Sequence, residues 1–241
     1  MNTSASRLAD VIERVMNRSP RENGAAALQD VFGAKTKVEV LRRVGELAAL
    51  VEQVEREVRA LPEEEEPDHL LEHLPQIRTF TESLLLAGSV PMENIQRQAS
   101  REAIYSLRSC AAALRRNGKA EPRIPEEAAQ VLIGDVRRIM EDVIAGDFER
   151  GLKVFLLDRL RAVETALLNI RVTGYPGVEI ALDALTSGAL RQTEGGTKER
   201  SRVGEMLSRL WSSVTGAAEG TQALSATAAQ TIQTIQAITG N

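Results

Sequence analysis

The residues best suited to chemistry in this sequence are its two histidines, which lie four positions apart with a glutamate just before the second. The segment reads His69-Leu70-Leu71-Glu72-His73. On an α-helix, side chains four residues apart lie on one face, so the two imidazoles could hold a zinc ion together. Glu72 could then activate a water molecule bound to that ion. This segment is the candidate metal site of the sequence.

The same five residues match the HxxEH pattern, and in this segment the chain resembles the inverzincin metallopeptidases. The resemblance implies that His69 and His73 are zinc ligands and that Glu72 is the general base. It also implies a third ligand, a glutamate farther along the chain, for which Glu141 and Glu149 are candidates. The resemblance covers five residues only. The interpretation that we favour is a chance pair of surface histidines beside an acidic hinge.

Other sequence signals of chemistry are weaker. The chain has no glycine-rich phosphate loop, no serine elbow and no CxxC pair. Its single cysteine, Cys110, precedes three alanines in a helical pattern, which favours a small buried residue over a reactive thiol. A basic cluster surrounds a predicted turn and consists of Arg115, Arg116, Lys119 and Arg123. Because no aromatic residues are interleaved with it, we interpret this cluster as a solvated turn.

Composition indicates a folded chain of helices. Hydrophobic residues make up 43% and charged residues 27%, as in ordinary globular proteins. Only 3% of residues are aromatic, so leucine, valine, isoleucine and alanine must fill the core, which favours packed helices. The net charge of −4 argues against a protein that binds nucleic acid through phosphate contacts. The excess of arginine over lysine and the abundant alanine fit a GC-rich bacterial genome.

Helical periodicity extends over most of the chain and predicts an all-α, multi-helix bundle. Thr36 and Glu39 have capping-box spacing, which predicts the start of a long helix. Elsewhere, prolines or an aspartate mark helix starts and glycines mark helix ends. The further helices predicted in this way cover residues 75–88, 91–118, 125–146, 147–174 and 178–188. Short connections between them predict antiparallel neighbours.

The long helix near the N-terminus carries the most regular apolar pattern. Its apolar residues alternate steps of four and three, which is typical of a narrow seam that faces a partner helix. This seam consists of Val40, Val44, Leu47, Val51, Val54, Val58 and Leu61. The partner helix belongs either to this chain or to another subunit. We therefore treat the seam as a candidate interaction surface.

The C-terminal part differs in composition, because Glu219 is the only charged residue after Arg209. A helix with basic residues, Trp211 and an apolar face could lie in a membrane interface. A docked or oligomer-forming helix is the interpretation that we favour. The candidate interface of this tail consists of Val203, Met206, Leu207, Leu210, Trp211, Val214, Leu224, Ile232 and Ile235.

Changes in composition predict four segments. Residues 1–61 hold the N-terminal helices with the seam, residues 62–189 an antiparallel bundle, residues 190–200 a linker and residues 201–241 the charge-poor tail. The first boundary is an acidic run between two prolines. No stretch has the uncharged apolar length of a signal peptide or a membrane-spanning helix. We therefore expect a cytoplasmic protein, with peripheral membrane association as the alternative.

These patterns favour a helical protein that is not an enzyme, needs no cofactor and binds itself or another helical protein. One alternative is a peripheral membrane or membrane-perturbing effector that acts through the tail. The other is a zinc-dependent hydrolase at His69, Glu72 and His73. A nucleic-acid partner is not expected.

Overall fold

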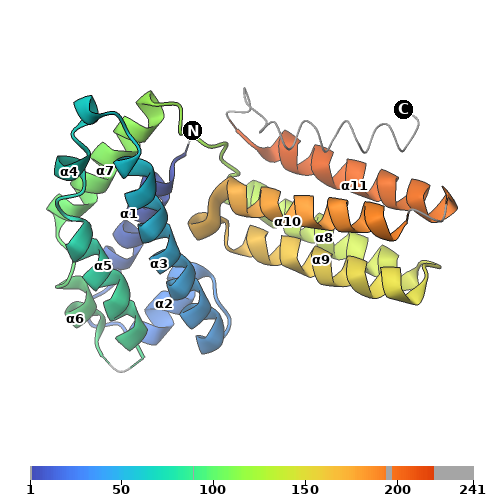
Figure 1. Cartoon of the computed structure of the whole chain (residues 1–241). Helices are drawn as coiled ribbons and strands as arrows, with labels where there is room; N and C mark the ends of the chain where they lie inside the picture. Colours follow the sequence, from blue (N-terminus) through green and yellow to red (C-terminus); the bar gives the residue numbers. More distant parts are fainter. Residues whose placement is uncertain (1, 89, 194–196, 220–241) are drawn as a thin grey trace. The chain divides into compact units, whose positions relative to one another are not determined.

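The computed structural model describes residues 2–88, 90–193 and 197–219, and every regular element in these ranges is a helix (Figure 1). Extended backbone pairing in the same ranges is limited to isolated bridges. The all-α prediction is therefore confirmed. The chain divides into two compact units, which we call the first unit, Asn2–Glu121, and the second unit, from Pro122 onward.

The first unit is built from helices α1 to α7 and two short 3-10 helices, η1 and η2. The longest of them, α3, contacts α1, α2, α5 and α7. It is therefore the element around which the unit is packed. In chain order the elements are α1 (Ser4–Met16), α2 (Gly24–Phe32), α3 (Lys37–Arg59), η1 (Glu63–Glu65), α4 (Pro67–Leu70), α5 (Leu74–Ser83), η2 (Leu84–Leu86), α6 (Met92–Gln96) and α7 (Arg101–Arg116).

Side-chain caps fix where the first-unit helices begin. The Thr36 hydroxyl accepts from the N–H of Glu39 at 3.2 Å, which confirms the predicted start of α3. The Glu39 carboxylate reaches back one residue farther than a capping box requires, to the N–H of Lys35 at 2.6 Å. At α1, Thr3 and Ser6 form a complete capping box. Local sequence thus determines these two starts.

Six of the seven seam residues belong to α3 and Leu61 follows its end, and all seven lie in the core of the first unit. Each of them is at most 8% exposed, and helices of the same chain pack against α3. Of the two partners that the sequence leaves open, the structure provides the internal one. The described part of the chain therefore buries the seam inside the first unit.

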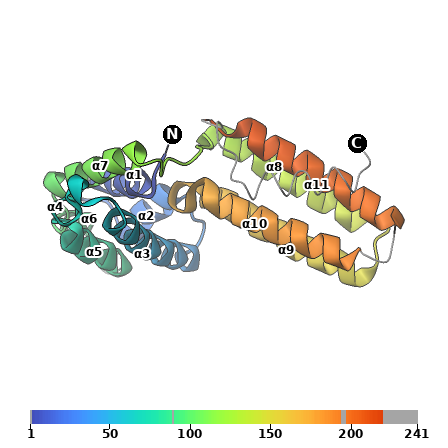
Figure 2. The same ribbon diagram turned by 45° about the horizontal axis from the view of Figure 1, so that its top comes forward.

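The second unit is a four-helix bundle whose helices alternate in direction along the chain (Figures 1 and 2). Each helix contacts two others, in the order α8, α9, α10, α11 and back to α8. The apolar face of every helix can therefore point into one shared core. The helices are α8 (Glu126–Ala145), α9 (Arg150–Leu168), α10 (Ile170–Gln192) and α11 (Thr197–Ala217).

Helix α10 contains the break that the sequence predicts as a turn. Gly174 has φ +65° and ψ −170°, a conformation that residues with a Cβ avoid, and Pro176 follows in the next turn. The helix predicted for residues 147–174 is nevertheless shorter than expected, because α9 ends at Leu168. A short irregular segment around Gly174 thus joins the last full turn of α9 to the main part of α10.

The two units do not coincide with the four segments predicted from composition. The acidic run lies inside the first unit, where the Glu65 carboxylate accepts from Arg116 and Asn117 of the α7 end. These donors offset the like-charge repulsion that predicts a hinge. Helix α11 begins at Thr197, within the predicted 190–200 linker, and packs in the second unit. The tail residues Leu224, Ile232 and Ile235 lie outside the described residues.

Two pairs of backbone hydrogen bonds flank the connection between the units. Asn2 and Glu121 exchange hydrogen bonds of 2.9 and 2.8 Å within the first unit. Arg123 and Glu219 exchange hydrogen bonds of 3.0 and 2.7 Å within the second. Pro122 is the one residue between these two bridges. The residue before Pro122 is therefore paired within the first unit, and the residue after it is paired within the second.

Candidate functional site

The helix predicted to carry both histidines is interrupted between them. Helix α4 ends at Leu70, and α5 begins at Leu74 after a turn. His69 belongs to α4, whereas His73 precedes the first residue of α5 as its N-cap. Pro75 lies in the first turn of α5, a position that proline favours. The prediction that one helix presents both imidazoles is therefore wrong.

The motif residues also lie on an open surface. The Nδ1 atom of His69 is 3.6 Å from Oε2 of Glu72, and these side chains are 75% and 63% exposed. Within the described ranges, no three His, Cys, Asp or Glu side chains are grouped so that they could share a metal ion. The suggested third ligands, Glu141 and Glu149, belong to the second unit. This arrangement gives the zinc-hydrolase alternative no support.

The described part of the C-terminal tail is a docked helix. Trp211 of α11 is buried, and its Nε1–H donates to Oγ1 of Thr186 in α10 at 3.0 Å. The apolar face of α11 therefore packs into the second unit instead of facing a membrane or a partner. Among the described residues, no helix combines the length and apolar character needed to cross a bilayer. The buried members of the predicted interface are Val203, Met206, Leu207, Leu210, Trp211 and Val214.

Contacts within the protein also account for Cys110 and for Arg116 of the basic cluster. Burial raises the pKa of the Cys110 thiol to about 11, so the reactive thiolate is scarce at neutral pH. The thiol contacts the carbonyl oxygen of Leu70 at 3.3 Å. In the basic cluster, Arg116 forms an ion pair with Glu65. Neither feature points to a ligand.

A buried ionic cluster, which the sequence patterns do not reveal, joins α1, α3 and the end of the first unit. Arg7 is 2% exposed and donates to Glu121, while the Ser4 hydroxyl donates to Glu57. Burial lowers the pKa of Arg7, and the two glutamates oppose this effect. Burial also raises the pKa of Glu121. Because Arg7 is almost inaccessible, we assign the cluster to folding and not to ligand binding.

Large apolar side chains are exposed at the start of α3 and in η2. Val38 and Leu41 lie one helical turn apart on α3, and Leu85 and Leu86 are neighbours in η2. These four residues, which we call the apolar patch, are 51 to 76% exposed. Leu41 and Leu85 together line a pocket of about 190 Å³. The full lining is Ala25, Lys37, Val40, Leu41, Leu84, Leu85, Ala87 and Gly88.

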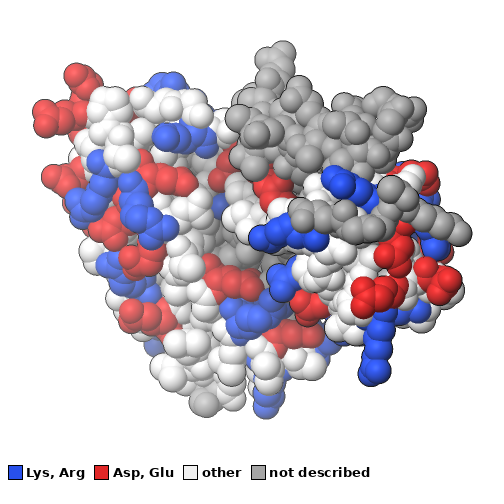
Figure 3. Space-filling view, turned by 45° about the vertical axis from the view of Figure 1, so that its right-hand side comes forward, with Lys and Arg blue, Asp and Glu red and all other residues white. Residues whose placement is uncertain are grey.

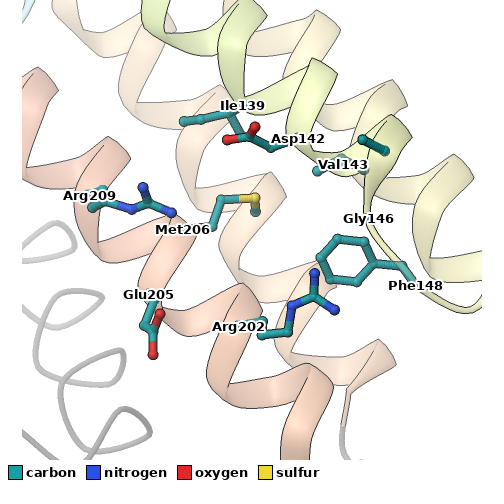
Figure 4. Close-up of a pocket in the computed structure, with 10 residues that line it drawn as sticks. Ile139, Asp142, Val143, Gly146, Phe148, Arg202, Glu205, Met206 and Arg209 are labelled. Carbon is teal, nitrogen blue, oxygen red and sulfur yellow. The ribbon is translucent and has the colours of Figure 1, made fainter.

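A second pocket, of about 400 Å³, lies between the end of α8 and the middle of α11 (Figure 4). We call it the charged pocket, because charged side chains from both helices line it. Arg202 and Arg209 come from α11, and Asp142 comes from α8. The lining residues are Ile139, Asp142, Val143, Ala145, Gly146, Phe148, Arg202, Glu205, Met206 and Arg209.

The distribution of charge is visible on one face of the molecule (Figure 3). On the face shown in Figure 3, lysine and arginine side chains alternate with aspartate and glutamate, and no large area carries one sign. A surface of this kind does not concentrate a highly charged polymer. The apolar patch and the charged pocket are therefore better candidates for binding than the charged side chains of this face.

Comparisons of this chain with protein family models, curated proteins and solved structures give no match. Function is therefore inferred from the geometry of these two surfaces.

Proposed function

We propose that this chain is a non-enzymatic binding protein whose first unit binds an apolar segment of another protein through the apolar patch. The observation that carries the proposal is a pocket lined by two exposed leucines, Leu41 and Leu85, with the exposed Val38 and Leu86 near them in the chain. Single exposed apolar residues are common, but a group beside a pocket is typical of an interaction surface.

The size and lining of the pocket support a protein partner. At about 190 Å³ it is smaller than the pockets that usually enclose metabolites or drug-sized molecules. It can accept one apolar side chain as an anchor, while Leu41 and Leu85 cover the surface around that anchor. Lys37 is the charged member of the lining, so an acidic residue beside the anchor is favoured.

An amphipathic helix is the partner structure that fits this surface best. Such a helix presents apolar side chains at positions i, i+3, i+4 and i+7, which can reach the pocket and the patch together. The proposed partner is therefore still a helical protein, as the sequence predicts, but it binds to exposed residues and not to the buried α3 seam. The membrane and zinc alternatives receive no support from the described residues and are not proposed.

Peptide selection tests the proposal directly. A displayed library of helical peptides would be selected on the intact protein, and binding would then be measured for the double variant Leu41→Glu/Leu85→Glu. We expect selected peptides to carry apolar anchors at helical spacing with nearby acidic residues. We also expect the double variant to bind them at least about tenfold more weakly, because loss of an anchor typically costs more than 1 kcal/mol.

The matched control is the variant Val154→Glu/Ile180→Glu, which places two glutamates on exposed apolar positions of the second unit. It changes net charge equally and should leave peptide binding unchanged. Equal binding by the two double variants would contradict the proposal. Failure of the intact protein to select any peptide with apolar anchors would contradict it as well.

A further inference from the structure

The charged pocket of the second unit combines an apolar floor with a rim of opposite charges. Val143 and Met206 are buried at its base, and Ile139 lies beside them. Its volume of about 400 Å³ lies within the usual range for small-molecule sites. The pocket could therefore surround a small ligand rather than a single side chain.

One guanidinium group is held in place at the wall of this pocket. The Cζ atom of Arg202 lies 4.6 Å from the centroid of the Phe148 ring, and Nη1 donates to the carbonyl oxygen of Asp147 at 3.2 Å. These contacts leave other N–H groups of Arg202 for a ligand. An arginine that is already ordered loses less conformational entropy when a ligand binds.

Gly146 allows Phe148 to take this position. A Cβ atom at residue 146 would lie 2.9 Å from Cε2 of Phe148 and 2.9 Å from the carbonyl oxygen of Asp142. The helix end, the aromatic ring and the arginine therefore form one packed wall. The turn between α8 and α9 thus determines the position of the Arg202 guanidinium group.

A second guanidinium group, that of Arg209, faces the same space. Arg209 follows Arg202 by seven residues, which places both on one face of α11. In Figure 4 the side chains of Arg209 and Asp142 reach toward the pocket from its two walls. Among the described residues, no hydrogen bond or ion pair joins the side chain of Arg209 or of Asp142 to another group. As far as the described residues go, the donors of Arg209 and the acceptors of Asp142 thus have no protein partner at this rim.

We propose that the charged pocket binds a small organic monoanion that carries one carboxylate on an apolar chain. The two arginines supply donors for the carboxylate, and the floor of Ile139, Val143 and Met206 covers the chain. Asp142 and Glu205 bring the rim charge to zero, which disfavours dianions such as a phosphate monoester. The site is separate from the apolar patch and does not depend on its proposed role.

Nuclear magnetic resonance titration of the full chain with hexanoate tests this assignment. Hexan-1-ol and hexylammonium have the same apolar chain with a neutral or a positive head group. We expect hexanoate to shift amide signals of residues 139–148 and 202–209. It should bind at least about tenfold more tightly than hexan-1-ol, because hydrogen bonds to a charged group exceed those to neutral groups. It should also bind more tightly than hexylammonium, because an ammonium group cannot accept hydrogen bonds from the two guanidinium groups. Equally tight binding of hexan-1-ol or hexylammonium would overturn the proposal.

Substitutions on α11 locate the site. Arg202→Gln and Arg209→Gln should each weaken hexanoate binding by about five- to tenfold, since each removes a charged donor. The control is Arg200→Gln, which removes the same charge from the same helix outside the pocket lining. If all three variants bind hexanoate equally, the anion is bound elsewhere and the assignment is wrong. Unchanged circular dichroism would show that the variants keep their helices.

Discussion

At the scale of single residues, Gly24 marks a place where two backbones approach closely. A Cβ atom on this first residue of α2 would lie 2.5 Å from the carbonyl oxygen of Ala87. A backbone oxygen cannot turn aside as a flexible side chain can. Gly45, in the exposed middle of α3, has no atom within 4 Å of such a Cβ. The two glycines therefore predict opposite responses to the same substitution.

We expect Gly24→Ala to destabilise the first unit by about 1–3 kcal/mol, the usual cost of overpacking. Gly45→Ala should instead stabilise it by about 0.5–1 kcal/mol, because alanine has the higher helix propensity. Urea unfolding followed by circular dichroism measures both values. A stabilising Gly24→Ala variant would show that α2 does not contact the Ala87 backbone in solution.

The contribution of the buried ionic cluster to the stability of the first unit depends on pH. Burial raises the pKa of Glu121, Arg7 opposes this increase, and Glu57 adds to it. A carboxyl group whose pKa is higher in the folded state stabilises the fold at low pH, and this contribution is lost as pH rises through the folded pKa. Without Arg7, the pKa of Glu121 would rise further. Loss of the arginine should therefore be most harmful at neutral pH.

The variant Arg7→Leu tests this predicted dependence of stability on pH. We expect it to lose about 3–5 kcal/mol of stability at neutral pH, because it leaves buried carboxylates without their cation. At pH 4, which lies below the raised pKa of Glu121, this carboxyl is protonated in the folded state and the loss should be smaller. Urea unfolding at both pH values, with the exposed Arg56→Leu as control, gives the comparison. A loss that is the same at both pH values would contradict the proposed role of charge.

At the scale of elements, α3 has a buried face and an exposed apolar position on the same helix. Leu47 is fully buried, whereas Leu41 of the apolar patch is 51% exposed. Leu47→Ala should reduce the free energy of unfolding by about 2–5 kcal/mol, as expected for a cavity in a packed core. Leu41→Ala should change it by less than about 0.5 kcal/mol. Similar losses for both, measured by urea unfolding, would mean that Leu41 supports the fold instead of a binding surface.

The starts of helices and their buried faces were accessible from sequence, because both depend on neighbouring residues. Thr36 identifies the start of α3 through a contact three residues away. The regular spacing of its valines and leucines identifies the buried face. The covering helices could not be identified in this way, because contacts between distant segments leave no periodic signal. The interruption between His69 and His73 was signalled by Pro75, but its effect on the motif required the structure.

The candidate sites were less predictable than the helices. Three consecutive leucines, 84–86, exceed what one helical face can bury, and this was a usable signal for the apolar patch. The charged pocket had no such signal, because Phe148 and Arg202 are far apart in sequence and meet only when α11 closes the bundle. Isolated charges on amphipathic helices are ordinarily solvent-facing. Their convergence is a property of tertiary packing.

At the scale of the whole molecule, each unit has a core of its own. Among the described residues, the buried apolar side chains that form the core of the second unit run from Ile124 to Ala218. We expect Leu47→Ala to lower the stability of the first unit alone and Leu160→Ala, in α9, to lower that of the second alone. Hydrogen exchange with mass spectrometry measures protection in both units at once. Equal loss of protection in both units for either variant would show that they unfold as one.

Pro122, the single residue between the two backbone bridges, also affects where a protease can cut the chain. A protease must draw several consecutive residues in extended form into its active site, and most proteases cleave poorly beside proline. Glu121 and Arg123 are engaged in backbone pairing on either side of Pro122. Opening a cleavage site there would require both bridges to separate. Within the described residues, Pro122 and its two neighbours are therefore held by pairing and do not form a free loop of the kind at which multidomain proteins are commonly cut, so we expect the first cleavages to fall elsewhere.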